Sequence, residues 1–583
     1  METTTDTQSV RVERLDDLPL LLALQRQLGL AEVIDQEIPR HWLHQGLSLG
    51  QLVEGWNAYI LSQADHRKVH VRRWADAHCA VLSEGLGVSV CDTDFTDDRL
   101  GQVLTHLSDD AAWERIEARL WHQSVQVCRL RAERVRVDPT TIHGYHTVSQ
   151  DGLMQYGHSP DHPGQPQVKL VAASVDIGVN GHLVATDVVS GQRADDPLYQ
   201  PILHRLRQTL REPGLLYLGD SKMSAVATRA DIVANGDYYL VPLAEVGDIP
   251  TLLEACVESA VAGRQTATLI YATDQQGKST RRIAAGFETV RSQGYTPPGG
   301  KPICWQERVL VIRSAGQADQ AVAALQSRLT KAEAALMALT PCPGRGHRQV
   351  RDEVTLRQRA EAILSRFGVQ GYLGYSFQRE QTATTRLVGR GRTGPKRTRR
   401  ILTQVRYVIT GVQRDEAAIR AACWRLGWRL YATNQKADVL PLDEAIRLYR
   451  QAPRIERHFH LLNAAPVGIE PLFVRRDDQI KGLTRLLSLG VRLLTLIEIV
   501  ARRSLEQRKE KLTGLYEGNP KQQTDQPTAT RLLRAFRHIE RVCVLGAEQG
   551  LCYITPLSPL QRQILAILEL RDSIYQVPFQ NSG

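Results

Sequence analysis

The chain has 583 residues, of which 42% are hydrophobic and 23% are charged, and its 73 Lys and Arg exceed its 63 Asp and Glu by ten positive charges. This length is enough for roughly two to four domains with hydrophobic cores. The ordinary Gly and Pro content excludes a collagen-like or low-complexity chain, and the basic balance favours a polyanionic partner without identifying it.

Targeting and membrane segments are not predicted. The first ten residues lack the basic and apolar regions of a secretory signal. The longest apolar stretch, residues 486–500, carries Arg492 and Glu498 and is shorter than the ~20 residues that span a bilayer, so we expect a buried helix there and no membrane contact. Nine scattered cysteines without a C-x-x-C motif fit reduced thiols.

Helical periodicity dominates residues 11 to about 130. Leu15, Leu18 and Leu21 recur at helical spacing, and Trp113 and Ile116 share a face of a second segment. The pattern predicts an all-helical N-terminal domain over residues 1–130. Such a domain could bind DNA ends or serve as a scaffold.

At Arg134 the period changes from 3.6 to 2, which predicts a strand that ends on Asp138. An Asn180-Gly181 turn then joins two strands, and two helices alternate with two further strands, the first of which leads into Asp220. This order predicts a mixed α/β sheet over residues 131–244 that begins with a hairpin.

Residues 245–435 interrupt this plan with a segment rich in β-strands. It contains a basic run, residues 386–400, with seven Lys and Arg and no acid. Gly and Pro in the run predict an exposed loop that contacts the DNA backbone. The predicted contact residues after Arg386 are Arg390, Arg392, Lys396, Arg397, Arg399 and Arg400.

Helical patterns return over residues 436–503. Residues 504–583 are predicted to form a polar linker and a C-terminal helical segment that includes an amphipathic stretch at 529–544. No repeat and no P-loop motif is evident, so nothing indicates an ATP motor.

Three acidic residues, Asp138, Asp220 and Glu456, stand where a sheet and a packed helix could bring them together. Converging carboxylates repel one another, and Mg²⁺ or Mn²⁺ relieves that repulsion. Two such ions ~3.5–4 Å apart serve in-line attack on a phosphodiester. An Asp at the end of a strand is also a common turn cap.

Four motifs in this order carry a resemblance. They are Asp138-Pro-Thr-Thr, the run from Ser190 to Asp196, Leu218-Gly-Asp220, and Tyr449 followed by residues 455–459. Together they are similar to bacterial insertion-sequence transposases of the DDE group. The resemblance implies an RNase H-like mixed-sheet core in residues 131–244 and 436–503, split by the β-rich insertion 245–435.

The resemblance further implies a DNA transposase that cuts the ends of its element and joins the freed 3′-hydroxyl to target DNA. Asp138, Asp220 and Glu456 would hold two Mg²⁺ ions, for which Mn²⁺ may substitute. The implied partners are double-stranded DNA, both terminal inverted repeats and target, and a second copy of the chain. The implied location is the bacterial cytoplasm, at the nucleoid when DNA is bound.

The late helix departs from the family pattern. Tyr449 and Glu456 match, whereas Ala452 and Asn463 stand where the family has Arg and Lys. Phosphate contacts could instead come from Arg450, Arg454 or Arg457, because Arg reaches phosphate from several backbone positions. Tyr449 could stack on DNA or belong to the core, and Pro453 favours the first turn of a separate helix.

Two other functions stay open. The departures at Ala452 and Asn463 fit a catalytically impaired DNA-binding relative, and the acidic triad alone fits a metal-dependent phosphoesterase of small substrates. A further pattern, His143, His146, His158 and His162, has spacings that could indicate a zinc cluster. The Gly- and Pro-rich segment around these residues favours exposed or DNA-facing histidines instead.

Overall fold

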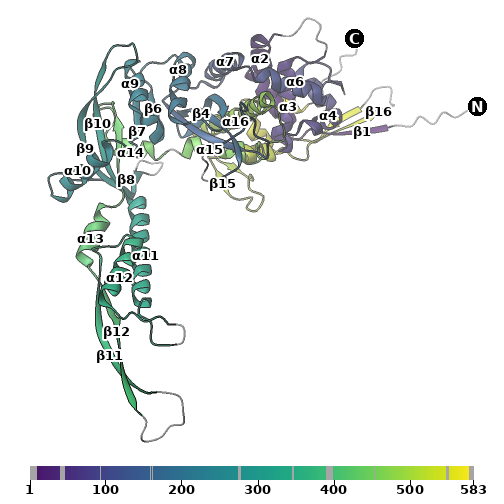
Figure 1. Ribbon diagram of the computed structural model, residues 1–583. Coiled ribbons are helices and arrows are strands. Elements are labelled where there is room, and N and C mark those ends of the chain that lie inside the picture. Colours follow the sequence, from purple (N-terminus) through teal and green to yellow (C-terminus); the bar gives the residue numbers. More distant parts are fainter. Residues whose placement is uncertain are drawn as a thin grey trace, which may run out of the picture.

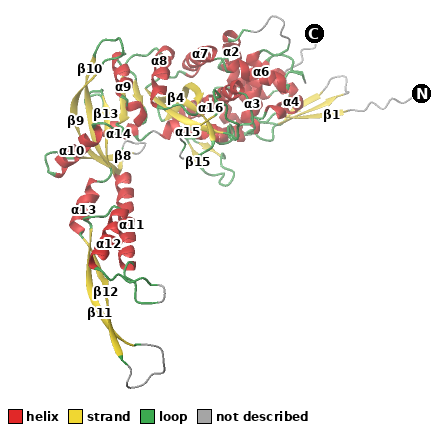
Figure 2. Ribbon diagram, viewed as in Figure 1, coloured by secondary structure: helices red, strands yellow, loops and turns green. Residues whose placement is uncertain are grey.

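The computed structural model describes residues 9–39, 46–91, 93–157, 159, 162–273, 278–344, 347–388, 398–451, 453–545 and 551–576. The chain is a mixed α/β protein. A helical body lies at one end, a large sheet follows it, and a narrow arm projects from the far side of the sheet (Figure 1). Figure 2 shows that the end of this arm consists of two strands.

Five strands form the first half of the sheet: β2 (Arg134–His143), β4 (Pro166–Ile177), β5 (Asn180–Ser190), β6 (Leu216–Leu218) and β7 (Tyr238–Pro242). Their spatial order is β5-β4-β2-β6-β7. β4 is antiparallel to β2 and β5, whereas β2, β6 and β7 are parallel. Short β3 (Gln155–Tyr156) also pairs with β4. The predicted mixed sheet with an initial hairpin is confirmed.

Helices connect the parallel strands, as crossover connections between such strands require. Two segments precede β6, namely η1 (Asp196–Leu198) and α8 (Tyr199–Leu210), and α9 (Val226–Ala234) precedes β7. Tyr199, Ile202 and Leu206 of α8 pack in the same buried cluster as Val135 and Val137 of β2. The hydrophobic face of α8 therefore covers one face of the sheet.

Four strands of the predicted insertion continue the same sheet: β8 (Thr268–Thr273), β9 (Ser279–Tyr295), β10 (Ile303–Ser314) and β13 (Trp428–Thr433). The order from β7 is β7-β13-β10-β9-β8, and every pair is antiparallel. These four strands of residues 245–435 therefore extend the core sheet. β13 covers the edge of β7, and an exposed edge of that kind would invite aggregation. Helix α10 (Ile249–Val261) lies between β7 and β8.

The arm grows from three helices: α11 (Ala315–Ala338), α12 (Glu353–Phe367) and α13 (Glu416–Arg425). They enclose the base of a hairpin formed by β11 (Leu373–Leu387) and β12 (Arg399–Arg414), and Leu329, Leu356 and Ile409 are buried there. Beyond this base both strands are largely exposed and extend away from the protein (Figure 1).

The described residues of the basic run, 386–388 and 398–400, lie at the far end of the hairpin. Arg386 lies in β11, and Arg399 and Arg400 begin β12. The segment predicted as a loop over residues 386–400 is therefore extended strand at both ends. Arg390, Arg392, Lys396 and Arg397 lie outside the described residues.

In the described part of residues 1–130, seven helices belong to the helical body, as the leucine spacing predicts: α1 (Leu18–Gln27), α2 (Leu30–Glu37), α3 (Leu49–Gln63), α4 (Lys68–Ala77), α5 (Cys79–Leu86), α6 (Asp97–Leu107) and α7 (Asp110–Cys128). The exception is strand β1 (Ser9–Arg14), which pairs with a strand near the C-terminus. The segment 1–130 is thus almost, but not entirely, helical.

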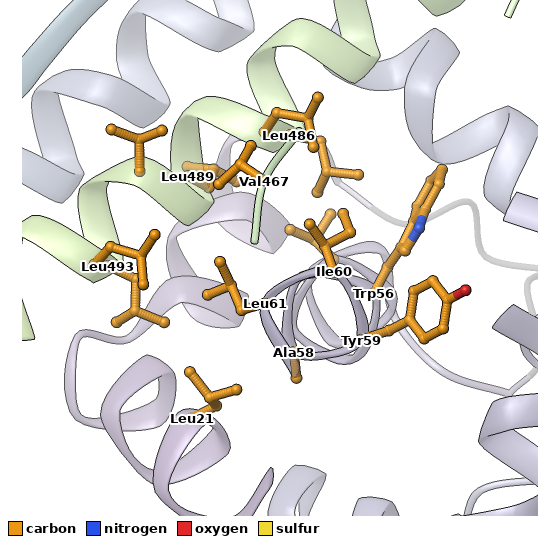
Figure 3. Close-up of a cluster of buried hydrophobic side chains, with 14 of the residues drawn as sticks. Leu21, Trp56, Ala58, Tyr59, Ile60, Leu61, Val467, Leu486, Leu489 and Leu493 are labelled. Atoms are coloured by element: carbon orange, nitrogen blue, oxygen red, sulfur yellow. The ribbon is translucent and has the colours of Figure 1, made fainter. Parts of the chain in front are cut away.

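Helix α16 (Asp477–Arg508) completes the core of this helical body. Leu486, Leu489 and Leu493 of α16 lie beside Leu61 and Leu21 from the N-terminal helices (Figure 3). Residues 482–499 of α16 are buried on every side of the helix, so neighbouring elements must cover it all round. The N-terminal helices and residues 436–503, predicted as separate domains, therefore share one core. None of the described helices is long and apolar enough to cross a membrane.

The C-terminal part contains more strand than predicted. Helix α17 (Ala529–Arg534) ends early, and the rest of the amphipathic stretch becomes β16 (Glu540–Leu545). β16 pairs with β1 and with β17 (Leu551–Ile554), and α18 (Pro559–Ile567) follows. In place of a polar linker, the chain forms the small pair β14 (Leu512–Thr513) and β15 (Gln523–Thr524).

One cysteine pair corrects the prediction of reduced thiols throughout. Cys543 and Cys552 are directly opposite in the β16–β17 register and form a disulfide. Cysteine spacing did not reveal this pair, because its closeness depends on a strand register that the helical pattern concealed. The other seven cysteines are free.

Candidate active site

Two neighbouring parallel strands bring Asp138 and Asp220 to the same level of the sheet. Arg136 of β2 is the register partner of Leu218, which ends β6. Asp138 and Asp220 each follow two residues beyond that pair. Because paired strands lie about 4.8 Å apart, Asp220 leaves the end of β6 beside Asp138 of β2.

Strand β2 does not end at Asp138, as the sequence pattern predicted. It continues to His143, and Asp138 pairs with Ala172 of β4. Pro139 is tolerated because β6 covers only Arg134–Arg136, so beyond that point β2 has a partner strand on the β4 side alone. Because β6 is short, Asp138 has no partner strand on the β6 side, and its side chain is partly buried there.

Glu456 comes from α15 (Pro453–Asn463), which is separate from α14 (Leu442–Tyr449). The break is where Pro453 predicted it, because proline fits the first turn of a helix better than its interior. Tyr449 and Glu456 consequently lie on different helices and do not form one continuous stripe.

Buried polar contacts hold α15 against the sheet. The carboxylate of Asp176, fully buried in β4, accepts hydrogen bonds from Arg136 at 2.8 and 2.9 Å and is 3.0 Å from the Arg454 guanidinium. His458, on the buried side of α15, lies 3.1 Å through Nε2 from the carbonyl oxygen of Gly181. These contacts leave Glu456 on the exposed side of the helix.

The electrostatics of Asp138 show that these acids share one environment. Burial, followed by the negative charges of Asp220, Glu456 and Asp195, raises the pKa of Asp138 from 3.8 to about 7. Three of these residues are the predicted triad, which is therefore brought together. The fourth, Asp195, belongs to the Ser190–Asp196 motif but was not predicted as a site residue.

Asp220 is held in place through one of its oxygens. Its Oδ1 accepts hydrogen bonds from the Tyr199 hydroxyl at 2.6 Å and from the backbone N–H of Lys222 at 2.9 Å. The second contact caps η2 (Ser221–Ser224), so Asp220 is a turn cap as well as a member of the acidic cluster.

Tyr199 and Lys169 support the acids, and sequence reasoning missed both. Burial and the Asp220 carboxylate raise the pKa of Tyr199 far above its ordinary value, so its hydroxyl remains a neutral donor. Lys169 of β4 lies 2.5 Å from Asp195. From sequence, only the position of Asp195 in the Ser190–Asp196 motif could have indicated this contact.

The donor set fits hard divalent cations. Carboxylate oxygens are the preferred protein ligands of Mg²⁺ and Mn²⁺. Such ions would neutralise the negative charges that, after burial, raise the pKa of Asp138. The oxygens of Asp138, Asp220 and Glu456 are not all within 4.8 Å of one another. Ligands of two ions ~3.5–4 Å apart spread more widely than ligands of one ion.

The predicted DNA contacts on the late helices have partners within the protein. The Tyr449 ring packs edge-on against Tyr431, with centroids 4.9 Å apart, which favours the core interpretation of Tyr449. The Arg450 guanidinium donates to the Ser314 hydroxyl at 2.8 Å. Arg457 pairs with Glu498 of α16 at 2.5 Å.

These arginines nevertheless converge. Arg450, Arg454 and Arg457 line a pocket of about 260 Å³ together with Arg502 of α16, which the sequence did not indicate. The pocket lies between the β4–β5 turn at Gly181 and the helices α15 and α16. Ala452 lies outside the described residues, and Asn463 ends α15.

Of the four histidines that could indicate a zinc cluster, the structure brings two together. His143 and His162 come together, with ring centroids 4.3 Å apart, and Glu470 joins them. His143 is buried, contrary to the expectation of exposed histidines, because it ends β2 beneath the segment that carries Glu470. His146 instead contacts the carbonyl oxygen of Val474 at 2.8 Å, and His158 lies outside the described residues.

Comparison with known proteins leaves the chain without a family. No family model and no curated protein matches it. Among solved structures, it is similar to a piggyBac transposase in a synaptic complex with hairpin DNA, determined by cryo-EM, with 11% identity and a TM-score of 0.24. The match covers 51% of this chain and 62% of that chain, less than two thirds of its length. A likeness this weak identifies neither fold nor function.

Proposed function

We propose that the chain is a DDE transposase that cleaves DNA strands at the ends of an insertion element and joins them to target DNA. The observation that carries the proposal is the coupling of Asp138 to Asp220 and Glu456, which are far apart in the sequence. Asp138 lies in β2, Asp220 follows the adjacent parallel strand β6, and Glu456 lies on a helix, which supports an RNase H-like core split by residues 245–435.

In this proposal the protein supplies a rigid acidic frame. Tyr199 and the η2 backbone orient Asp220, and the Asp176 network fixes the helix that carries Glu456. Asp138, Asp220 and Glu456 would hold two Mg²⁺ ions, with Mn²⁺ as a substitute. When bound, such ions lower the pKa of the attacking water or hydroxyl and neutralise charge on the leaving oxygen.

Positive charge supports double-stranded DNA as the substrate. Arg386, Arg399 and Arg400 are exposed at the end of the arm, more than a small substrate requires. This placement favours DNA over the small phosphoesters of a phosphoesterase. Terminal inverted repeats, target DNA and a homodimeric assembly belong to the same proposal. The complete triad favours an active enzyme over an impaired relative, despite Ala452 and Asn463.

A strand-cleavage and joining assay tests the proposal. The substrate is linear DNA that contains the sequences flanking the coding region, incubated with the full chain and Mg²⁺. We expect nicked and joined products from the wild type and from Asp151→Asn, whose exposed carboxylate lies outside the cluster. Asp138→Asn and Asp220→Asn should bind the DNA but yield neither product. Equal product from these two variants would refute the assignment.

A further inference from the structure

We propose that His143, His162 and Glu470 form a zinc site that is distinct from the acidic cluster. One potential ligand atom from each residue lies within 4.8 Å of the other two, and within the described part of the chain this is the single such set of three His, Cys, Asp or Glu residues. Nδ1 of His143 is 3.3 Å from Oε1 of Glu470.

Contacts around the site already orient His143 and Glu470 and fix the backbone at His162. Ser159 is buried, and its hydroxyl lies 3.2 Å from Nε2 of His143 and also accepts the backbone N–H of His162 at 3.2 Å. Glu470 accepts the backbone N–H of His143 at 2.8 Å. In metal sites a histidine ligand is commonly fixed by a hydrogen bond at its other ring nitrogen. The Ser159 contact leaves Nδ1 of His143 on the side of Glu470.

The ligand chemistry selects zinc over magnesium. Two imidazoles and a carboxylate are a common ligand set for Zn²⁺, whereas Mg²⁺ is bound through oxygen atoms. Three protein ligands leave a fourth tetrahedral position for water. His162 and Glu470 are accessible enough for an ion to enter, whereas His143 is only 8% exposed.

The position of the site suggests what the ion would do. His143 is five residues beyond Asp138 on β2, about 16 Å at the rise of a strand, so the two sites share no ligand. Glu470 lies in the segment that connects α15 to α16. A bound zinc ion would therefore join the strand that carries Asp138 to the segment that follows the Glu456 helix. We expect the ion, with water in its fourth position, to hold these two parts together.

Zinc titration of the full chain tests the site without DNA. The protein is first stripped with a chelator and then titrated in excess Mg²⁺, which competes for the carboxylates of the acidic cluster. His162→Gln and Glu470→Gln remove one ligand each, and the latter keeps an oxygen that can accept the His143 N–H. His106→Gln, at an exposed position in α6, is the matched control.

We expect the wild type and His106→Gln to bind one more zinc ion than the two ligand variants, or to bind it about 10–100-fold more tightly. Zinc should raise the melting temperature of the wild type and His106→Gln but not of the two ligand variants. Co²⁺ bound to the wild type and to His106→Gln should give the visible absorption band of tetrahedral coordination. Equal zinc stoichiometry, affinity and melting shift in all four proteins would overturn the proposal. Since no DNA is involved, this result is independent of the transposase assignment.

Discussion

At the scale of single residues, Asp138 determines the electrostatic state of the acidic cluster. Its carboxyl group is largely removed from water and lies in the field of Asp220, Glu456 and Asp195, so its pKa is about 7 instead of 3.8. Near neutral pH the group is balanced between its two protonation states. A nearby cation would shift that balance toward the carboxylate.

The raised pKa of Asp138 predicts how stability depends on pH. Between pH 3.8 and about 7 the folded protein holds a proton at Asp138 that the unfolded chain has released, so the metal-free protein loses stability as the pH rises. Asp138→Asn should raise the melting temperature at pH 8, and the gain should shrink at pH 5. Thermal melts in chelator check this, with Asp151→Asn as the control. A gain that grows at pH 5 would show that the pKa is not raised.

Mg²⁺ should act on the same carboxylate. We expect Mg²⁺ to raise the melting temperature of the wild type at pH 8 and to have a much smaller effect on Asp138→Asn, because a ligand that binds only the folded state stabilises it. Equal shifts in both proteins would place the stabilising ion elsewhere.

A substitution at Tyr199 tests whether its hydroxyl orients the Asp220 carboxylate. Tyr199→Phe removes the hydroxyl that donates to Asp220 at 2.6 Å and keeps the ring in the core. We expect about a 10–100-fold lower rate of DNA cleavage, the usual cost of removing a hydrogen bond that orients a metal ligand. Tyr156→Phe, at an exposed hydroxyl, serves as the control. An unchanged rate would mean that Asp220 needs no such support.

At the scale of elements, helix α15 depends on a buried ion network. Asp176→Ala would leave Arg136 and Arg454 without their shared counter-charge, and breaking a buried pair in this way costs about 3–5 kcal/mol. Denaturant unfolding measures the loss. Asp443→Ala breaks an exposed pair with Arg447 and should cost no more than about 1 kcal/mol. Similar costs in both variants would contradict the anchoring role of Asp176.

The arm makes a separate prediction about DNA affinity. Replacing Arg386, Arg399 and Arg400 by Ala should weaken DNA binding and make the affinity less dependent on salt. The slope of log affinity against log salt should fall by about 0.9 for each phosphate that these arginines neutralise. Arg420→Ala, exposed on α13 at the base of the arm, should change neither quantity. Binding titrations at several salt concentrations distinguish these cases, and unaltered binding by the triple variant would remove the arm from the DNA interface.

The sequence predicts the elements of the site better than their extent. Alternation over residues 134–138 locates β2, and Pro453 locates the start of α15. The continuation of β2 past Pro139 was not predictable, because it depends on how far the neighbouring strand β6 reaches. The contact between Glu470 and His143 likewise depends on tertiary packing between distant segments, so local sequence patterns do not predict it.

At the scale of the whole molecule, segments that are distant in sequence share one hydrophobic core or one sheet. Helix α16 fills the core of the N-terminal helices, and β13 and β10 extend the sheet that begins at β2. Periodicity predicted each of these elements but could not tell which of them share a core. The boundaries at residues 130 and 245 therefore marked changes of pattern, not separations between independently packed bodies.

This shared core predicts that residues 1–130 do not fold alone. Without α16, the part of this buried cluster around Leu61 that faces Leu489 and Leu493 would be exposed to water. We expect the isolated fragment to aggregate or to lack a cooperative thermal transition, with weak near-ultraviolet circular dichroism from its buried tryptophans. A sharp, reversible transition would show that the N-terminal helices are an independent domain.

The proposed metal site of Asp138, Asp220 and Glu456 is best tested by the rate of DNA cleavage as a function of Mg²⁺ concentration. The rate is compared between the wild type and Glu456→Gln. Both proteins should bind the flanking DNA equally, because Glu456 is exposed and contributes no buried contact to the fold. We predict that the wild-type rate rises with Mg²⁺ and that the Glu456→Gln rate stays at background. Cleavage by Glu456→Gln at the wild-type rate, with the same Mg²⁺ dependence, would contradict this prediction.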